Sequence, residues 1–139
     1  MFCNTYNINT FNNYKYVVVL SEYNGKILLS RHKNRTTWET QGGHIENGET
    51  PVDAAKRELF EESGAVDFDI SPLCDYRAGI ENTSDFADGV VFCAKIRKLD
   101  NIPDNSEMAE VREFDTLPDN LTYPDITPKL FCQWQTKNK

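Results

Sequence analysis

Apolar residues along the chain fall into short runs typical of β-strands, placed on both sides of one region with helical spacing. The first run is rich in β-branched side chains, and Asn24-Gly25 after it predicts a tight turn into a second strand, so that the two strands form a hairpin. A polar, acidic loop at residues 81–87 separates two longer runs. Strands are predicted at residues 14–20, 26–31, 66–77, 88–98 and 111–114.

A central helix is predicted, with both of its ends marked by residue type. Thr50 can cap the first turn, Pro51 stands at the first helical position, where its missing N–H is tolerated, and Asp53 can complete a capping box. The helix is predicted to run to about Ser63, with Gly64 as its left-handed terminator.

Two neighbouring stripes are expected along this helix. At about 100° per residue, Glu58, Glu61 and Glu62 fall within one arc of roughly 100°. The adjacent arc is predicted to pack on the core and consists of Val52, Ala55, Leu59 and Ser63. Like charges at this spacing destabilise a helix by about 0.2–0.5 kcal/mol per pair, and anions near its C-terminus oppose the helix dipole. A bound cation would compensate, and clustered carboxylate oxygens favour a hard ion such as Mg²⁺ or Mn²⁺.

A second helix is predicted at residues 125–135, where apolar side chains recur with helical spacing: Ile126, Leu130, Phe131 and Trp134. Together with the strands, this gives a mixed α/β pattern without internal repeats or low-complexity linkers. The 139 residues leave room for one domain with one core, so residues 1–139 are expected to form a single domain.

The segment from Gly43 to Ala65 carries the most specific pattern in the chain. It reads glycine, five residues, glutamate, seven residues, then Arg-Glu-apolar-x-Glu-Glu-x-Gly-apolar. This pattern resembles the signature box of the Nudix hydrolases, and every position of the box is filled: Gly43, Glu49, Arg57, Glu58, Leu59, Glu61, Glu62, Gly64 and Ala65. The resemblance implies an α/β fold, the Nudix-type α/β/α sandwich with a mixed β-sheet. One departure is Gln41, which stands where many family members have proline before the two glycines.

The resemblance also implies metal-dependent hydrolysis of a phosphoanhydride bond in a nucleoside diphosphate-linked substrate. The implied metal ligands are the carbonyl of Gly43 and the carboxylates of Glu58, Glu61 and Glu62. Glu49 would support the glycine loop and the catalytic helix. Arg57, four residues before Glu61, can pair with that carboxylate and orient it. Family members differ in which glutamate takes the proton from water, so Glu61 and Glu62 both remain candidates for the base.

A further glutamate is expected outside the box. In many family members a stretch similar to residues 107–114, followed by Leu117-Pro118, comes after a loop that supplies a glutamate for metal binding or as the base. Glu110 matches this position best, and Glu107 is the alternative. Glu110 is therefore the loop-borne rival of the helix glutamates for the role of general base.

Positive charge gathers at residues 30–35, just before the glycines, in a chain that is otherwise acidic. Arg31 and Arg35 could hold the terminal phosphates of a substrate, because guanidinium groups bind phosphate bidentately. A solvated hairpin end is the alternative interpretation. Trp38 and Tyr123 could stack on a nucleobase.

Charge and composition restrict the partners. A net charge of -7 argues against a protein held on nucleic acid by a general basic surface, so the expected partner is a small nucleotide. The four cysteines show no spacing suited to zinc and are expected to be reduced. The N-terminus does not resemble a leader, and no apolar run approaches the roughly 20 residues of a membrane span, so a cytoplasmic protein is expected. The oligomeric state stays open.

Three functions remain open at this stage. The first is hydrolysis of a nucleoside triphosphate, including oxidised ones, to the monophosphate and pyrophosphate. It is favoured because the whole chain resembles bacterial MutT-like members of the family, and residues 117–124 resemble the corresponding segment of bacterial Nudix proteins that act on nucleoside triphosphates, including oxidised purine ones and triphosphate RNA ends. The second is a Nudix-fold sensor or ligand-binding module, although such proteins often lose box carboxylates and this chain has lost none. The third is removal of pyrophosphate from RNA 5′ ends.

Overall fold

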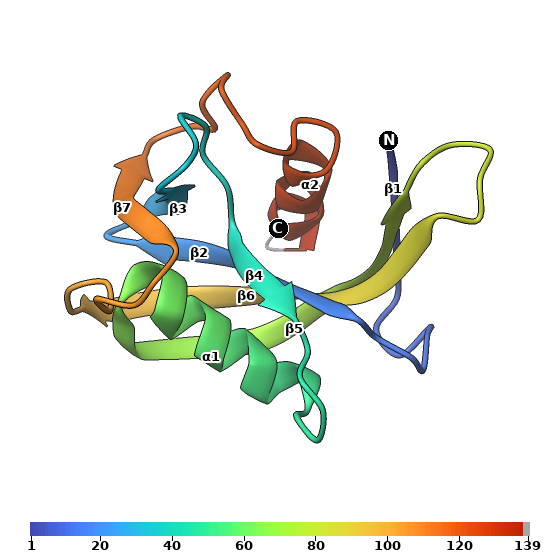
Figure 1. Ribbon diagram of the computed structural model, residues 1–139, viewed down its shortest axis with the longest axis horizontal. Helices are drawn as coiled ribbons and strands as arrows, with labels where there is room; N and C mark the ends of the chain where they lie inside the picture. The colour runs from blue at the N-terminus through green and yellow to red at the C-terminus, as the bar shows by residue number, and fades with distance from the viewer. Residues whose placement is uncertain (138–139) are drawn as a thin grey trace.

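The structure, a computed structural model, describes residues 1–137. This part of the chain forms a seven-stranded sheet with two helices (Figure 1). The strands are β1 (Phe2–Tyr6), β2 (Tyr16–Tyr23), β3 (Lys26–His32), β4 (Gln41–His44), β5 (Ala65–Gly79), β6 (Phe86–Leu99) and β7 (Met108–Phe114). The helices are α1 (Pro51–Ser63) and α2 (Thr127–Lys137).

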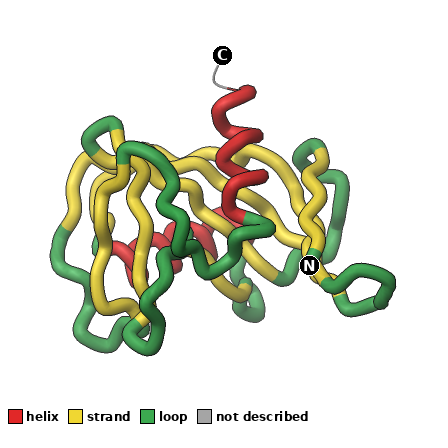
Figure 2. Tube along the Cα trace, turned by 90° about the horizontal axis from the view of Figure 1, so that it is seen from above, coloured by secondary structure: helices red, strands yellow, loops and turns green. Residues whose placement is uncertain are grey.

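The sheet is mixed and lies between the two helices. Its strand order is β1-β5-β6-β2-β3-β7, and β4 pairs with β2 off this path. β2 and β6 run parallel, whereas the other paired strands are antiparallel. The two helices cover opposite faces of the sheet, as Figures 1 and 2 show. The predicted α/β class and the α/β/α layering are confirmed.

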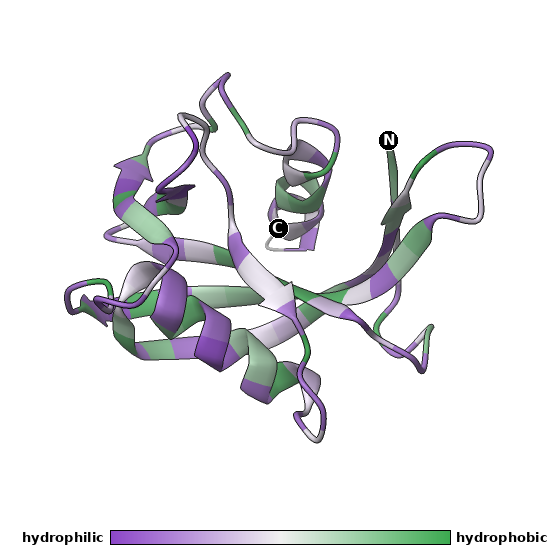
Figure 3. Ribbon diagram, viewed as in Figure 1, coloured by the Kyte–Doolittle hydropathy of each residue, from purple (hydrophilic) through white to green (hydrophobic). Residues whose placement is uncertain are grey.

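β2 shows how one strand supplies both cores. Val17 and Val19 belong to the apolar cluster under α1, together with Leu59 of the helix. Leu20 belongs to the cluster on the other face, where Leu130 of α2 packs. Successive side chains of a strand point to opposite faces, so a continuous apolar run is what a strand covered on both sides requires. In Figure 3 the middle turns of α1 carry several hydrophilic residues beside the buried apolar ones, so the helix has one side on the core and one side free of it.

The ends of α1 are those predicted from its residue types. The Thr50 hydroxyl accepts a hydrogen bond from the Asp53 N–H at 3.3 Å, and Pro51 opens the helix. Gly64 ends it with a φ of 81°, and its N–H donates to the Phe60 carbonyl at 2.8 Å. A left-handed residue at this position is strained unless it is glycine.

The buried face of α1 differs from the prediction. Val52 is exposed, and Ala54 is fully buried in its place. The buried side is thereby rotated toward the carboxylates, and Glu58 and Glu62 are half-buried instead of lying on a separate exposed stripe. The physical reason is that Gly42 and Gly43, which oppose them on β4, have no side chains to fill the space.

Two strands were not predicted. β1 is a short edge strand, and β4 is formed by Gln41, the two glycines and His44, none of which is β-branched. The glycines therefore lie inside a strand. Gly42 pairs with Val18 of β2, and a Cβ on Gly42 would meet the carbonyl oxygen of Val17.

Candidate active site

Glycine at position 43 lets the helix carboxylates approach β4. A Cβ added to Gly43 would lie 2.6 Å from Oε1 of Glu58, which is closer than a carbon and an oxygen can stand. The carboxylate of Glu58 consequently rests against the backbone of β4, with 13% of its side chain exposed. Glu61, on the outer side of the same helix, keeps 48% of its side chain exposed.

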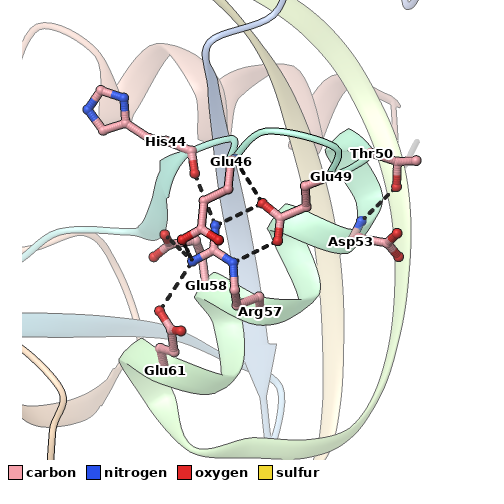
Figure 4. A network of polar contacts seen from close by, with 8 residues as sticks. All are labelled: His44, Glu46, Glu49, Thr50, Asp53, Arg57, Glu58 and Glu61. Carbon is pink, nitrogen blue, oxygen red and sulfur yellow. Dashed lines mark hydrogen bonds and ion pairs between the residues drawn. The ribbon is translucent and has the colours of Figure 1, made fainter.

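Arg57 is the centre of a polar network that joins the end of β4 and the loop at residues 45–50 to α1 (Figure 4). It donates to both carboxylate oxygens of Glu49, at 2.8 and 3.0 Å, and to Glu58 at 2.9 Å. It also donates to Glu61 at 3.3 Å and to the carbonyl of His44 at 3.1 Å. The predicted pairing of Arg57 with Glu61 is present, but it is one contact among several.

The electrostatic consequence differs from one glutamate to the next. Hydrogen bonds from Arg57 hold the pKa of Glu49 at about 2, and the N–H of Glu46 contributes to this effect. Burial raises the pKa of Glu58, against the opposing effect of Arg57. Glu49 is thus firmly ionised. Glu58 also receives a hydrogen bond from Arg57, but its carboxylate is more buried.

Glu62 has the most perturbed environment of the three helix carboxylates. Burial raises its pKa to about 9, and the nearby charges of Glu58, Glu39 and Glu107 act in the same direction. The Gly42 N–H, which donates to Glu62 Oε1 at 2.7 Å, opposes this rise. A carboxylate in such surroundings is protonated at neutral pH unless a cation offsets its charge.

Glu39 is a site residue that the sequence did not reveal. It pairs with Ser30 across the strands, so both side chains point to the face that carries α1. Its carboxylate is nearly buried and accepts hydrogen bonds from Arg35 at 2.9 Å and from the Thr122 hydroxyl at 3.1 Å. No local pattern marks this residue, because its position depends on a pairing between distant segments.

The structure does not bring Glu110 to the helix carboxylates, and it does not place it on a loop. Glu110 lies within β7, and its neighbour Val111 packs into the core under α1, so Glu110 is directed to the other face. There it pairs with Arg31 at 3.1 Å. Glu107, the alternative, lies on the loop before β7 and is one of the charges that act on Glu62.

The two predicted phosphate-binding arginines are placed differently. The guanidinium of Arg35 forms an ion pair with the carboxylate of Glu39. Arg31 follows Ser30 along β3 and is directed away from α1, toward Glu110 and the main-chain oxygen of Arg35. The structure thus pairs Arg35 with Glu39, whose charge acts on Glu62, and pairs Arg31 with Glu110 on the other face.

A cavity of about 440 Å³ borders β4 on the face that carries α2. Aromatic rings line it, with Tyr16 tilted against His44 at a centroid distance of 4.4 Å and with Tyr76 and Tyr123 nearby. Trp38, the other predicted stacking residue, is buried in the core against Phe114. A strand with carboxylates on one side and an aromatic cavity on the other can hold the two ends of a nucleotide.

Comparison with known proteins adds the family. Residues 13–130 match the family model of the NUDIX domain. The chain belongs to the Nudix family. Proteins of this family generally use divalent metal ions. The Nudix box corresponds to β4, the following loop and α1, the elements that carry the network around Arg57.

Curated Nudix relatives match a part of the chain. RNA pyrophosphohydrolases from Tolumonas auensis and Francisella philomiragia are 35% and 33% identical over 60 residues, which is 43% of this chain in each case. The matched segment spans 34% and 39% of the length of those proteins. The chain therefore matches well under half of each relative.

Solved structures resemble the whole fold. The Bacillus subtilis pyrophosphohydrolase BsRppH is 25% identical with a TM-score of 0.79, and the match covers 97% of this chain and 90% of that one. A Nudix hydrolase from Nitrosomonas europaea is 18% identical with a TM-score of 0.72, and the match covers 91% and 92% of the two chains.

Within the described residues, no helix is long and apolar enough to cross a membrane.

The residues of the Nudix box fit a divalent cation in chemistry, though not in their present side-chain positions. The available donors are carboxylate and carbonyl oxygens, which suit Mg²⁺ or Mn²⁺, and Gly43 leaves a cradle that a side chain would fill. Among residues 1–137, no three acidic, imidazole or thiol groups converge closely enough to hold an ion as they stand. Arg57 engages both Glu58 and Glu61, so these two side chains must turn away from it to reach an ion.

Proposed function

We propose that this Nudix protein hydrolyses a phosphoanhydride bond of a nucleoside triphosphate, giving the monophosphate and pyrophosphate, with Mg²⁺ or Mn²⁺. The observation that carries the proposal is the position of β4. Its Gly43 lies against the carboxylate of Glu58, and the same strand lines the aromatic cavity of about 440 Å³. A nucleoside held in that cavity would have its phosphates directed across β4 to the helix glutamates.

The metal-holding role is proposed for the carbonyl of Gly43 and the carboxylates of Glu58, Glu61 and Glu62. When bound there, the ion would neutralise charge on the phosphate oxygens and make a nearby water more acidic. The uncompensated charge around Glu62 supports this assignment, because burial and neighbouring carboxylates already disfavour its ionised form. Arg57 would keep the loop before α1 fastened to the helix by way of Glu49.

A carboxylate must also take the proton of the attacking water. Glu61 and Glu62 are the proposed candidates, because α1 carries both next to Glu58 and fixes their positions along the helix. Glu107 replaces Glu110 as the additional candidate, since its charge acts on Glu62. Arg35 is the residue proposed to contact the terminal phosphates, because it lies beside Glu39.

A second candidate function is supported by the curated relatives, which are named RNA pyrophosphohydrolases. The same phosphoanhydride bond would be broken in both substrates. The RNA would differ from a free nucleoside triphosphate only in the nucleotides that follow the first one. A net charge of -7 provides no general basic surface for long RNA, so this function would depend on recognition of the 5′ end alone.

The experiment is a substrate panel with purified protein and Mg²⁺. Nucleoside triphosphates, including oxidised ones, should be compared with dinucleoside polyphosphates, nucleotide sugars and triphosphorylated RNA. We expect release of pyrophosphate from triphosphates, and Glu62→Gln serves as the matched inactive protein. Preference for triphosphorylated RNA would select the second function. Nucleotide binding without hydrolysis of any substrate would contradict both and favour a sensor.

A further inference from the structure

A line of buried polar side chains links the sheet to the end of α1. Ser21, Gln41 and Ser30 lie on β2, β4 and β3, and each is 0% exposed. The Ser21 hydroxyl donates to Gln41 Oε1 at 2.6 Å, and Gln41 Nε2 donates to the Ser30 hydroxyl oxygen at 2.9 Å. Polar groups this deep in a core must be hydrogen-bonded, and these three satisfy one another.

The line ends at Glu62. The Ser30 hydroxyl donates its single hydrogen to the main-chain oxygen of Glu62 at 2.8 Å. The Gln41 amide therefore faces the lone pairs of Ser30, and its second N–H is directed to the Leu28 carbonyl at 3.3 Å. All the bonds along the line donate toward α1, so each one polarises the next.

Glu62 is held at a second point by the residue next to Gln41. The N–H of Gly42 donates to Glu62 Oε1 at 2.7 Å. The main-chain oxygen of Glu62 belongs to the last turn of α1, where carbonyls have no partner inside the helix. Consecutive residues of β4 thus hold both the main chain and the carboxylate of Glu62, one through Ser30 and the other directly.

The other helix carboxylates are held in a different way. Glu58 and Glu61 receive hydrogen bonds from the cation Arg57. Among the described residues, the donors to Glu62 are a main-chain N–H and a hydroxyl, both neutral. These neutral donors hold Glu62 in place without setting a positive charge beside its carboxylate, so that position is left for a cation.

We propose that Gln41, acting through Ser30, is a positioning residue for Glu62. It sets the place of the last turn of α1 relative to Gly42, and thereby the place of the Glu62 carboxylate. The kinetic consequence rests on the proposed function, whereas the structural consequence can be measured without it.

The test compares two variants with a matched control. Ser30→Ala removes the last bond of the line, and Gln41→Met removes the amide at similar volume. Ser63→Ala is the control, because Ser63 is also a buried serine at the end of α1, but its hydroxyl bonds to Leu59 and Ala65 instead of Glu62. Each protein is examined by the kcat and KM of triphosphate hydrolysis. The proton resonance of the Gly42 amide is measured in the metal-free protein.

We expect Ser30→Ala and Gln41→Met to lower kcat by about 10- to 100-fold with little change in KM, as is usual for residues that orient a ligand. The Gly42 resonance should move toward its position in Glu62→Gln, because the bond to the carboxylate is weakened. Ser63→Ala should change neither quantity. If either serine variant fails to fold, Gln41→Met carries the comparison with the unmodified protein.

The proposal is overturned if the Gly42 resonance stays in place in the folded variants, or if kcat falls no further than in Ser63→Ala. A protein that hydrolyses no member of the substrate panel would refute the proposed function. The Gly42 resonance would then still decide whether Gln41 positions Glu62.

Discussion

Arg57 holds the carboxylate of Glu49 through two hydrogen bonds, one to each oxygen, at 2.8 and 3.0 Å. Glu49 lies in the loop before α1, and its Oε1 also accepts the N–H of Glu46 at 3.0 Å. The loop is therefore folded back onto the helix and fastened by a bidentate, charge-assisted contact. This contact depends on pH, because it needs an ionised Glu49.

The first prediction concerns acid stability. The pKa of Glu49 is lowered in the folded protein from an ordinary 4.5 to about 2. A lowered pKa gives stability that is fully present above the unfolded value and is lost as pH falls through the folded value. Glu49→Gln should therefore be less stable than the unmodified protein at pH 7, and the difference should disappear as the pH falls from 5 to 2. Urea unfolding at several pH values measures this.

Glu46→Gln is the matched control for that experiment. Its carboxylate stands 3.8 Å from Arg57 and is 67% exposed, so the contact is weak. We expect Glu46→Gln to follow the unmodified protein at every pH. A difference between Glu49→Gln and the unmodified protein that stays constant down to pH 2 would contradict the assigned ion pair.

The second prediction concerns the helix carboxylates. Glu61→Gln or Glu62→Gln should lower kcat by at least about 100-fold at saturating Mg²⁺, because each change removes a charge and preserves shape. Without metal, both variants should fold, and Glu62→Gln should be at least as stable as the unmodified protein at neutral pH, because burial disfavours the ionised carboxylate that it removes. Steady-state kinetics and thermal unfolding provide the measurements. Near-native activity of both variants would exclude the proposed mechanism.

The helix of the site could be predicted because its signals are local. Thr50 and Pro51 begin it, Gly64 ends it, and the spacing of the glutamates places them on one side. The strand β4 could not be predicted in the same way. Its glycines have low strand propensity, and it forms because pairing with β2 and the close approach of Glu58 favour residues without side chains.

The positions of Glu110 and Glu39 show a second limit. Both depend on which face of a strand a side chain takes, and that is decided by neighbours far away in the sequence. Val111 enters the core under α1 and directs Glu110 away from it, whereas pairing with Ser30 directs Glu39 toward α1. The spacing of residues in the sequence does not indicate which face of the sheet either glutamate takes.

The third prediction separates the two arginines. Arg35→Ala should weaken the use of triphosphates, because Arg35 lies beside Glu39, and the effect should be smaller for substrates with two phosphates. Arg31→Ala should have less effect, since its guanidinium contacts Glu110 on the other face. The values of kcat/KM for paired nucleoside triphosphates and diphosphates measure this. Equal, small losses on all substrates would favour a solvated surface role for both residues.

The last prediction compares Glu107 with Glu110. Glu107 lies on the loop before β7 and its charge acts on Glu62, whereas Glu110 is held in β7 by Arg31, so the same substitution should have different effects at the two positions. We expect Glu107→Gln to lower kcat by about 10- to 100-fold, as for an auxiliary ligand, and Glu110→Gln to lower it much less. Both rates should be measured over a range of Mg²⁺ concentrations, because loss of an auxiliary ligand also raises the Mg²⁺ requirement. If Glu110→Gln is the more damaging change, β7 must turn or shift when substrate binds, and the loop assignment is wrong.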